Sequence, residues 1–157
     1  MEEKKGEVWL GTSGSTYVYD GKTFTVFEPK DGQAFTNVWS IMEDKKGNIW
    51  LGGNEGLWRY DSRTFTHFTE NSVNYVYEDR KGNIWTSGGS DNGQGFLLSC
   101  YDTASLSDKK PTITQITQSL NLFRILEARD GSIWFGALDG LYRYDGTTIT
   151  DFKGGQK

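Results

Sequence analysis

One four-residue motif occurs four times in this chain, as Gly6-Glu7-Val8-Trp9, Gly47-Asn48-Ile49-Trp50, Gly82-Asn83-Ile84-Trp85 and Gly131-Ser132-Ile133-Trp134. The Trp residues at positions 9, 50, 85 and 134 are therefore 41, 35 and 49 residues apart. A second motif follows two of the copies, as Gly56-Leu57-Trp58-Arg59-Tyr60-Asp61 and Gly140-Leu141-Tyr142-Arg143-Tyr144-Asp145. Repeats of about 40 residues that contain only short β-like segments are typical of β-propeller blades. The sequence therefore predicts an all-β propeller.

Length and composition agree with this class and exclude several others. The 157 residues suffice for one domain, and the 20 glycines and 15% aromatic residues suit short strands joined by tight turns. The net charge is −4, with both signs scattered along the chain, so we expect no nucleic-acid partner. No apolar run is long enough to span a membrane, and Met1-Glu2-Glu3-Lys4-Lys5 lacks the apolar segment of a signal peptide. We expect no membrane insertion by this chain.

The repeat divides the chain into about four blades of four antiparallel strands. The blades are expected at about residues 6–35, 36–70, 71–118 and 119–153 of a single domain, 1–157. In the second blade, alternating residues predict strands at 37–43, 48–52, 57–60 and 64–68. The first blade is expected to lack its innermost strand, because residues 2–6 align with residues 43–47 and Met1 therefore falls inside the turn.

Three arrangements are compatible with this blade count. The chain could close a four-bladed ring with one thin blade, or be a piece of a longer propeller. Alternatively, two copies could join as a homo-oligomer that completes one larger ring. A missing strand leaves backbone groups unpaired, so each arrangement requires something to cover them.

The residues that repeat are expected to serve the scaffold. Gly47, Gly82 and Gly131 are placed at turns that need a positive φ. Asp44 and Asp79 lie three residues earlier, where a carboxylate accepts backbone N–H groups and closes the turn. In the fourth blade Ala128 takes that position, and we expect Asp130 to substitute for the missing carboxylate. Binding of Ca²⁺ by these residues is the less favoured alternative, because the spacing lacks the alternating oxygen ligands of a calcium loop.

No catalytic or metal-binding pattern stands out. Cys100 has no partner for a disulfide and occupies the same repeat position as Arg59 and Arg143, so we interpret it as a strand residue. His67 is the only histidine and falls on an outer strand, away from the expected channel. Because a metal site needs several ligands, we predict no metal, no cofactor and no enzymatic activity.

Candidate ligand-binding residues come from the expected mouth of the central channel, where the innermost strands begin. These positions differ between the blades and are therefore free of the demands of the scaffold. Aromatic faces combined with amide and guanidinium groups suit a sugar, so the expected partner is a small molecule or oligosaccharide. The alternative is that Trp39 and Phe123 are core residues. The candidate residues are Asn37, Trp39, Asn74, Tyr75, Asn121, Phe123 and Arg124, with Ser72 at the position equivalent to Asn37.

The motifs resemble the two-component regulator propeller repeat. Residues 38–52 followed by residues 56–61 match the repeat nearly throughout, the fourth blade departs from it at Ala128, and the other two blades match in part. The resemblance implies a sensor propeller of a bacterial hybrid two-component system, often exported to the periplasm or cell exterior and often sensing oligosaccharides.

We therefore predict a non-enzymatic propeller that binds a ligand or a partner protein. One alternative is a structural, self-assembling propeller that joins another copy. A less favoured alternative is an enzyme similar to streptogramin lyases, which share the Asp-x-x-Gly-Asn-Ile-Trp motif but need a catalytic base and metal ligands near the channel.

Overall fold

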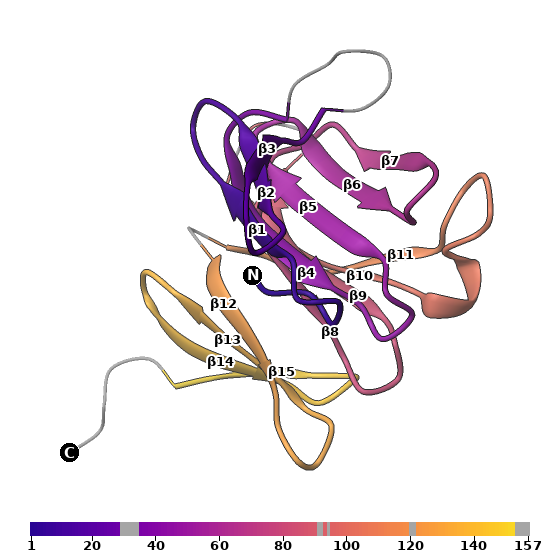
Figure 1. The fold of residues 1–157 in the computed structure, drawn as a ribbon. Helices are drawn as coiled ribbons and strands as arrows, with labels where there is room; N and C mark the ends of the chain where they lie inside the picture. Colours follow the sequence, from indigo (N-terminus) through magenta and orange to yellow (C-terminus); the bar gives the residue numbers. More distant parts are fainter. Residues whose placement is uncertain (29–34, 91–92, 94, 120–121, 153–157) are drawn as a thin grey trace. The chain divides into compact units, whose positions relative to one another are not determined.

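The computed structural model describes residues 1–28, 35–90, 93, 95–119 and 122–152, and it is built from β-strands (Figure 1). The strands form four antiparallel sheets of three, four, four and four strands, each in chain order from one edge to the other. This architecture confirms the predicted all-β class. The chain forms two compact units, Met1–Val76 and Tyr77–Lys157.

The first unit contains the first and second sheets. The first sheet consists of β1 (Val8–Gly11), β2 (Thr16–Tyr19) and β3 (Phe24–Val26). The second sheet consists of β4 (Val38–Glu43), β5 (Ile49–Gly53), β6 (Gly56–Tyr60) and β7 (Phe65–Thr69). The strands predicted for residues 36–70 agree with these to within one residue at each end.

A short stretch of chain lies where the first sheet was expected to lack a strand. The backbone N–H of Trp9 donates to the carbonyl oxygen of Met1 at 2.7 Å, and Glu2 forms an antiparallel bridge with Val8. In the second sheet, Met42 pairs with Trp50 and Glu43 with Ile49 in the same register. Met1 and Glu2 therefore hold the positions that end an innermost strand.

Buried side chains of the first and second sheets pack together in the core of the first unit. Trp9 of β1 is 3% exposed and clusters with Phe35, Val38, Ile49 and Leu51. Burying a large apolar side chain stabilises a fold by about 1.5–3 kcal/mol. Trp9 of the first sheet thus packs against buried side chains of the second sheet.

The third and fourth sheets follow along the chain, with the boundary between the two units inside β8. The third sheet consists of β8 (Val73–Glu78), β9 (Ile84–Gly89), β10 (Phe96–Tyr101) and β11 (Ile113–Ser119). A 3₁₀ helix, η1 (Thr103–Ser105), lies in the long connection between β10 and β11. The fourth sheet consists of β12 (Leu122–Glu127), β13 (Ile133–Ala137), β14 (Gly140–Tyr144) and β15 (Ile149–Asp151).

The first turn of the second sheet shows why the repeat has its particular residues. Gly47 has a φ of +86°, as predicted for a glycine at this turn. One oxygen of Asp44 accepts the backbone N–H groups of Lys46 and Asn48, each at 2.9 Å. The other oxygen accepts Asn48 Nδ2 at 2.8 Å and the indole Nε1 of Trp50 at 2.9 Å. We call this arrangement the Asp–Trp clamp, because one carboxylate closes the turn and anchors the buried indole.

The third sheet repeats the clamp, and the fourth sheet replaces it. Asp79 accepts Trp85 Nε1 at 2.9 Å. In the fourth sheet Asp130 accepts the Ser132 hydroxyl at 2.6 Å, and that hydroxyl oxygen accepts Trp134 Nε1 at 3.1 Å. Asp130 therefore substitutes for the missing carboxylate, as the sequence predicted.

The first sheet lacks the Asp–Trp clamp among its described residues. Glu3 stands where the second sheet has Asp44, and its side chain is one methylene longer. Within the described residues, Trp9 Nε1 and Glu3 Oε1 are buried and have no hydrogen-bond partner. Burial, and next the charge of Glu7, raise the pKa of Glu3. The longer acid thus leaves the Trp9 indole unanchored and places two carboxyl groups close together.

Candidate functional site

Trp39, the strongest aromatic candidate, lies in a β-bulge at the start of β4. Val38 pairs with Gly53 and Ser40 pairs with Gly52, so Trp39 is an extra residue with no partner on β5. The Trp39 side chain is 53% exposed. Bulges bend a strand locally and re-aim a side chain, and they occur often beside functional sites. Trp39 is therefore an outward-facing residue of this unit rather than part of its core.

The backbone before this bulge is held in an unusual conformation. Asn37 has a φ of +51°, a region in which asparagine is one of the few tolerated residues. The carbonyl oxygen of Asn37 accepts the backbone N–H of Asn54 at 3.1 Å. A Cβ on Gly53 would lie 2.2 Å from that carbonyl oxygen, so residue 53 must be glycine for the bulge to close. The bulge therefore depends on a residue of each strand region, Asn37 before β4 and Gly53 at the end of β5.

Phe123, the second aromatic candidate, lies in a similar irregularity of the fourth sheet. Leu122 pairs with Ala137 and Ile125 with Phe135, so Phe123 and Arg124 together stand opposite Gly136. Phe123 is 54% exposed, and Arg124 is exposed as well. The first strands of two sheets therefore each present an exposed aromatic side chain at a bulge.

The other candidate ligand-binding residues are less exposed or lie outside the described part of the chain. Asn74 and Tyr75 are half-buried neighbours near the start of β8, and Asn121 lies outside the described residues. Asn37, Trp39, Asn74 and Tyr75 belong to the first unit, whereas Phe123 and Arg124 belong to the second. That all of them surround one channel mouth stays a prediction.

His67, the one histidine of the sequence, packs against an aromatic side chain. Its ring stacks on Trp58 with centroids 4.1 Å apart, on β7 at the outer edge of the second sheet. The described residues contain no group of three or more His, Cys, Asp or Glu side chains that could hold a metal ion. None of the helices in the described part of the chain has the length and apolar character needed to cross a bilayer.

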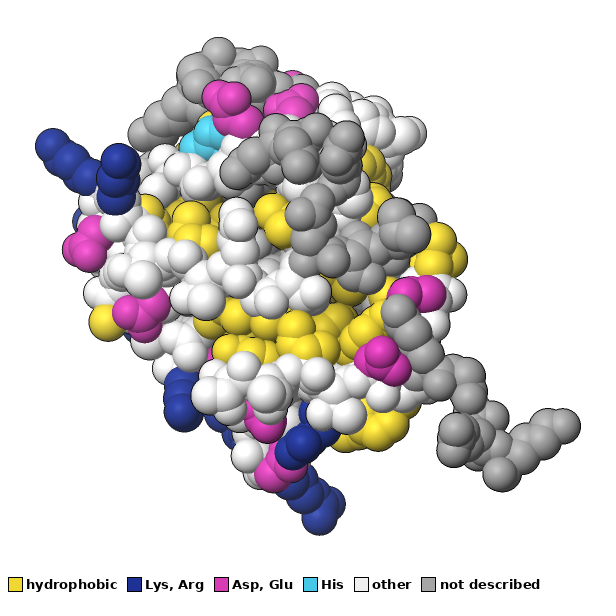
Figure 2. All heavy atoms as spheres, turned by 180° about the vertical axis from the view of Figure 1, so that it is seen from behind, with side chains coloured by type: hydrophobic (Ala, Val, Ile, Leu, Met, Phe, Trp, Pro, Cys, Tyr) yellow, Lys and Arg dark blue, Asp and Glu magenta, His cyan; other side chains and the backbone are white. Residues whose placement is uncertain are grey.

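The surface shows no concentration of one charge on the face drawn in Figure 2. Lys and Arg side chains are interspersed with Asp and Glu side chains there, and hydrophobic side chains are also in view. This face offers nothing that resembles a basic nucleic-acid surface.

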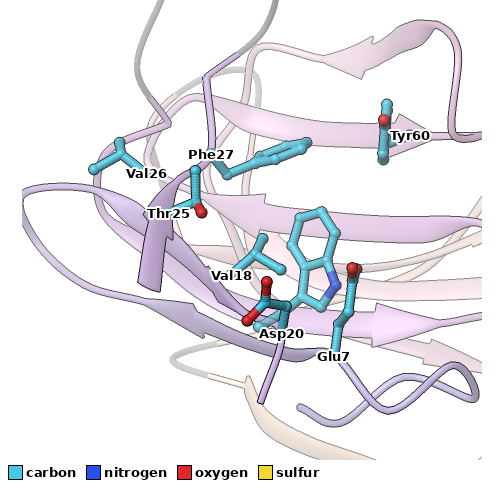
Figure 3. Close-up of a pocket in the computed structure, with 8 residues that line it drawn as sticks. Glu7, Val18, Asp20, Thr25, Val26, Phe27 and Tyr60 are labelled. Atoms are coloured by element: carbon cyan, nitrogen blue, oxygen red, sulfur yellow. The ribbon is translucent and has the colours of Figure 1, made fainter. Parts of the chain in front are cut away.

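A cavity over the first sheet was not predicted from the sequence. It has a volume of about 270 Å³ and is lined by both carboxylate and aromatic side chains. Figure 3 shows Glu7, Val18 and Asp20 close together, and Tyr60, from the second sheet, lies across from Phe27. The signal that could have revealed the cavity is Val18, which stands where the second and fourth repeats have Arg59 and Arg143.

A comparison with protein families supports the repeat motif directly. Residues 32–55 match the family model described as "Two component regulator propeller". The resemblance to this family is confirmed. The matched segment, residues 32–55, contains Trp39 with its bulge and the Asp–Trp clamp of the second sheet. No curated protein matches the chain in a sequence search.

One solved structure shows the same fold. The chain is similar to the extracellular domain of the putative one component system BT4673 from B. thetaiotaomicron, with a TM-score of 0.75 and 23% identity. That match covers 95% of this chain and 21% of the other, so the chain spans about a fifth of the larger domain. A second structure, the extracellular domain of the putative hybrid two component system BT4673, has a TM-score of 0.37, 14% identity and coverages of 99% and 32%. The first of these matches shows that the four sheets are consistent with a propeller-like fold.

Proposed function

We propose that this chain is a non-enzymatic, ligand-binding part of a sensor propeller, and that it contacts an oligosaccharide through the bulged first strands. The observation that carries the proposal is the pair of exposed aromatic residues at bulges, Trp39 and Phe123. Neither ring is needed to fill the core of its own unit. The similarity to an extracellular domain of a putative one component system supports a sensory role outside the cytoplasm.

The chemistry of these positions suits a sugar. A sugar ring has an apolar face that packs on an aromatic side chain and a polar rim that bonds to amides and guanidinium groups. Asn37, Asn74 and Arg124 supply such polar groups, and Asn121 belongs to the same set. In a propeller, the first strands of the blades line the channel, which would bring these residues to one mouth.

Thermal unfolding with a panel of oligosaccharides tests this proposal. A ligand at 100 times its Kd stabilises the folded state by about 2.7 kcal/mol, which raises Tm by several degrees in a chain of this size. We expect at least one oligosaccharide to raise Tm in the wild type and Trp39→Ala to remove the increase. Phe24→Ala is the matched control, because Phe24 is 63% exposed and lies on β3 rather than on a first strand. A panel without any stabilising sugar, or equal loss in both variants, would contradict the proposal.

A second candidate function, assembly into a larger ring, is favoured by the fourth sheet. Leu126, Leu138 and Leu141 are 61%, 64% and 45% exposed. Leu126 and Leu141 lie on β12 and β14, and Leu138 lies in the turn between β13 and β14. We take these exposed apolar side chains as a surface that another element covers. Light scattering separates the alternatives: a dimer supports two chains that share one ring, and a monomer supports a ligand site built by one chain.

A further inference from the structure

One position in every sheet lies directly opposite the repeated Trp on the neighbouring strand. The cross-strand pairs are Trp9 with Val18, Trp50 with Arg59, Trp85 with Cys100 and Trp134 with Arg143. On its other side the same position pairs with a threonine in all four sheets, namely Thr25, Thr66, Thr114 and Thr150. The four positions are therefore structurally equivalent, and Val18 stands where two other sheets have an arginine.

In the second sheet this position is a binding place for the chain's own guanidinium group. Arg59 Cζ lies 5.7 Å from the centroid of the Trp50 ring and 5.3 Å from that of Phe68. Both distances fall within the range of a cation–π interaction. The charge of Arg59 also contributes to the lowered pKa of Asp61, after the larger effect of the hydrogen bonds from Thr64 and Arg63.

The fourth sheet uses its arginine in a related way. Arg143 Nη2 lies 3.0 Å from Asp130 Oδ2. In the third sheet, where Cys100 takes the position, burial raises the pKa of the thiol to about 12, and the charges of Asp79 and Asp102 add to the effect. The position opposite the repeated Trp therefore has carboxylates near it in the third sheet as well, where Cys100 replaces the arginine.

The first sheet keeps the surroundings of this position but lacks the cation. The Trp9 and Phe27 rings correspond to Trp50 and Phe68, and their centroids are 4.5 Å apart. Asp20 takes the place of Asp61, and Glu7 takes the place of the neutral Asn48, which adds a second carboxylate. Because Val18 is much shorter than arginine, the cavity of about 270 Å³ remains, lined by all five of these side chains.

Asp20 and Glu7 bring two carboxyl groups to this cavity. Asp20 also accepts Lys22 N and Thr23 N, and Glu7 shares a hydrogen bond with Glu3. Backbone N–H groups of Thr23 and Lys22 lower the pKa of Asp20, so that it is ionised at neutral pH. Neither Glu7 nor Asp20 takes part in the ion pairs Arg80–Glu127 and Arg143–Asp130 found within the described part of the chain. The buried Trp9 indole forms one wall, and its ring supplies an aromatic face for a cation.

We propose that this cavity binds the guanidinium group of an arginine ligand, in the place that Arg59 fills in the second sheet. The volume lies just below that of sites for drug-sized molecules, so it suits one side-chain group rather than a large ligand. A guanidinium group fits better than an ammonium group, because it is planar, stacks on aromatic faces and bonds to carboxylates in a forked geometry. The site differs in place and chemistry from the sugar-binding strands proposed above.

Calorimetric titration with N-acetyl-arginine methylamide tests the proposal. We expect a Kd on the order of 1 mM, because a single small cation buries little surface. The lysine analogue should bind more weakly, and urea, a neutral group of similar shape, should not bind at matched concentration. A Gly-Arg-Gly peptide and free arginine distinguish an arginine in a polypeptide from a small-molecule source.

Variants of Val18 and Glu7 give the decisive comparison. Val18→Arg supplies the chain's own guanidinium group and should abolish binding, whereas Val18→Ala keeps the cavity and should retain it. Glu7→Gln should weaken binding about tenfold and make it less sensitive to salt, because one carboxylate is neutralised. No binding to the wild type up to about 10 mM, which is a range that detects very weak complexes, would overturn the proposal. Unchanged binding in Val18→Arg would also overturn it, and if that variant does not fold, unchanged binding in Glu7→Gln would do so.

Discussion

Replacing Asp44 with alanine removes the Asp–Trp clamp of the second sheet and should destabilise the protein strongly. The Asp44 side chain accepts four hydrogen bonds, from Lys46 N, Asn48 N, Asn48 Nδ2 and Trp50 Nε1, at 2.8–2.9 Å. Asp44 is 5% exposed and Trp50 is 0% exposed, so water cannot replace the carboxylate at the indole.

The expected loss follows from these contacts. A buried donor left without an acceptor costs about 1–3 kcal/mol, and each of the three partly buried bonds contributes about 0.5–1 kcal/mol. Their sum is about 4 kcal/mol, which is a large part of the stability of an ordinary domain. The assay is urea denaturation followed by tryptophan fluorescence.

Asp61→Ala is the matched control for this prediction. Asp61 also closes a turn in the second sheet, with bonds from Arg63 N, Thr64 N and Thr64 Oγ1, but all of them are exposed. We expect a clearly smaller loss of stability, because water replaces the carboxylate there. Equal losses in the two variants would refute the reasoning that the buried indole makes the Asp44 clamp important.

Three further predictions concern other carboxyl and thiol groups. Glu3→Asp should raise the free energy of unfolding by about 1 kcal/mol in urea denaturation, because the shorter acid can accept the unpartnered Trp9 indole; a lower value would show that the first turn cannot form the clamp. Hydrogen bonds from Ser132 and next from Arg143 lower the pKa of Asp130 to about 2, so its stabilising effect is present above its ordinary pKa near 4 and is lost as the pH falls toward 2. The Tm difference between the wild type and Asp130→Asn should therefore shrink across that pH range, and a constant difference would contradict this assignment. The pKa of Cys100, raised to about 12, should make its alkylation by iodoacetamide at pH 8 slower than that of a free thiol by on the order of 1000-fold; alkylation at the free-thiol rate would contradict the burial of this side chain.

Much of the scaffold could be predicted from the sequence, because alternation and turn residues report local geometry. The strands of the second sheet, the positive φ of Gly47 and the turn-closing role of Asp44 all follow from local rules of this kind. The substitution by Asp130 could also be predicted, because Asp130 lies only two residues after Ala128 and its carboxylate can still reach the turn.

The features on which the two proposals rest depend on pairing between strands and were harder to predict. A bulge adds one residue to a strand without a change in composition, so the position of Trp39 appeared only when β4 was paired with β5. The hydrogen bond from the Trp50 indole to Asp44 depends on the exact geometry of the turn between β4 and β5. The cavity beside Val18 is lined by residues of four strands, β1, β2, β3 and β6. The meeting of the first strands at one channel mouth stays a prediction, because it depends on the arrangement of whole blades and not on any local pattern.

Trp39 is proposed to contact a sugar, whereas the tryptophans held by Asp44 and Asp79 serve the scaffold. Nitrogen-15 labelling of the indoles allows each tryptophan Nε1 signal to be followed by NMR during titration with the oligosaccharide that raises Tm most. We predict that the Trp39 signal shifts in a saturable manner, and that the buried Trp50 and Trp85 signals, held by Asp44 and Asp79, stay in place. A titration in which the Trp39 signal does not move, although the sugar binds, would contradict the account.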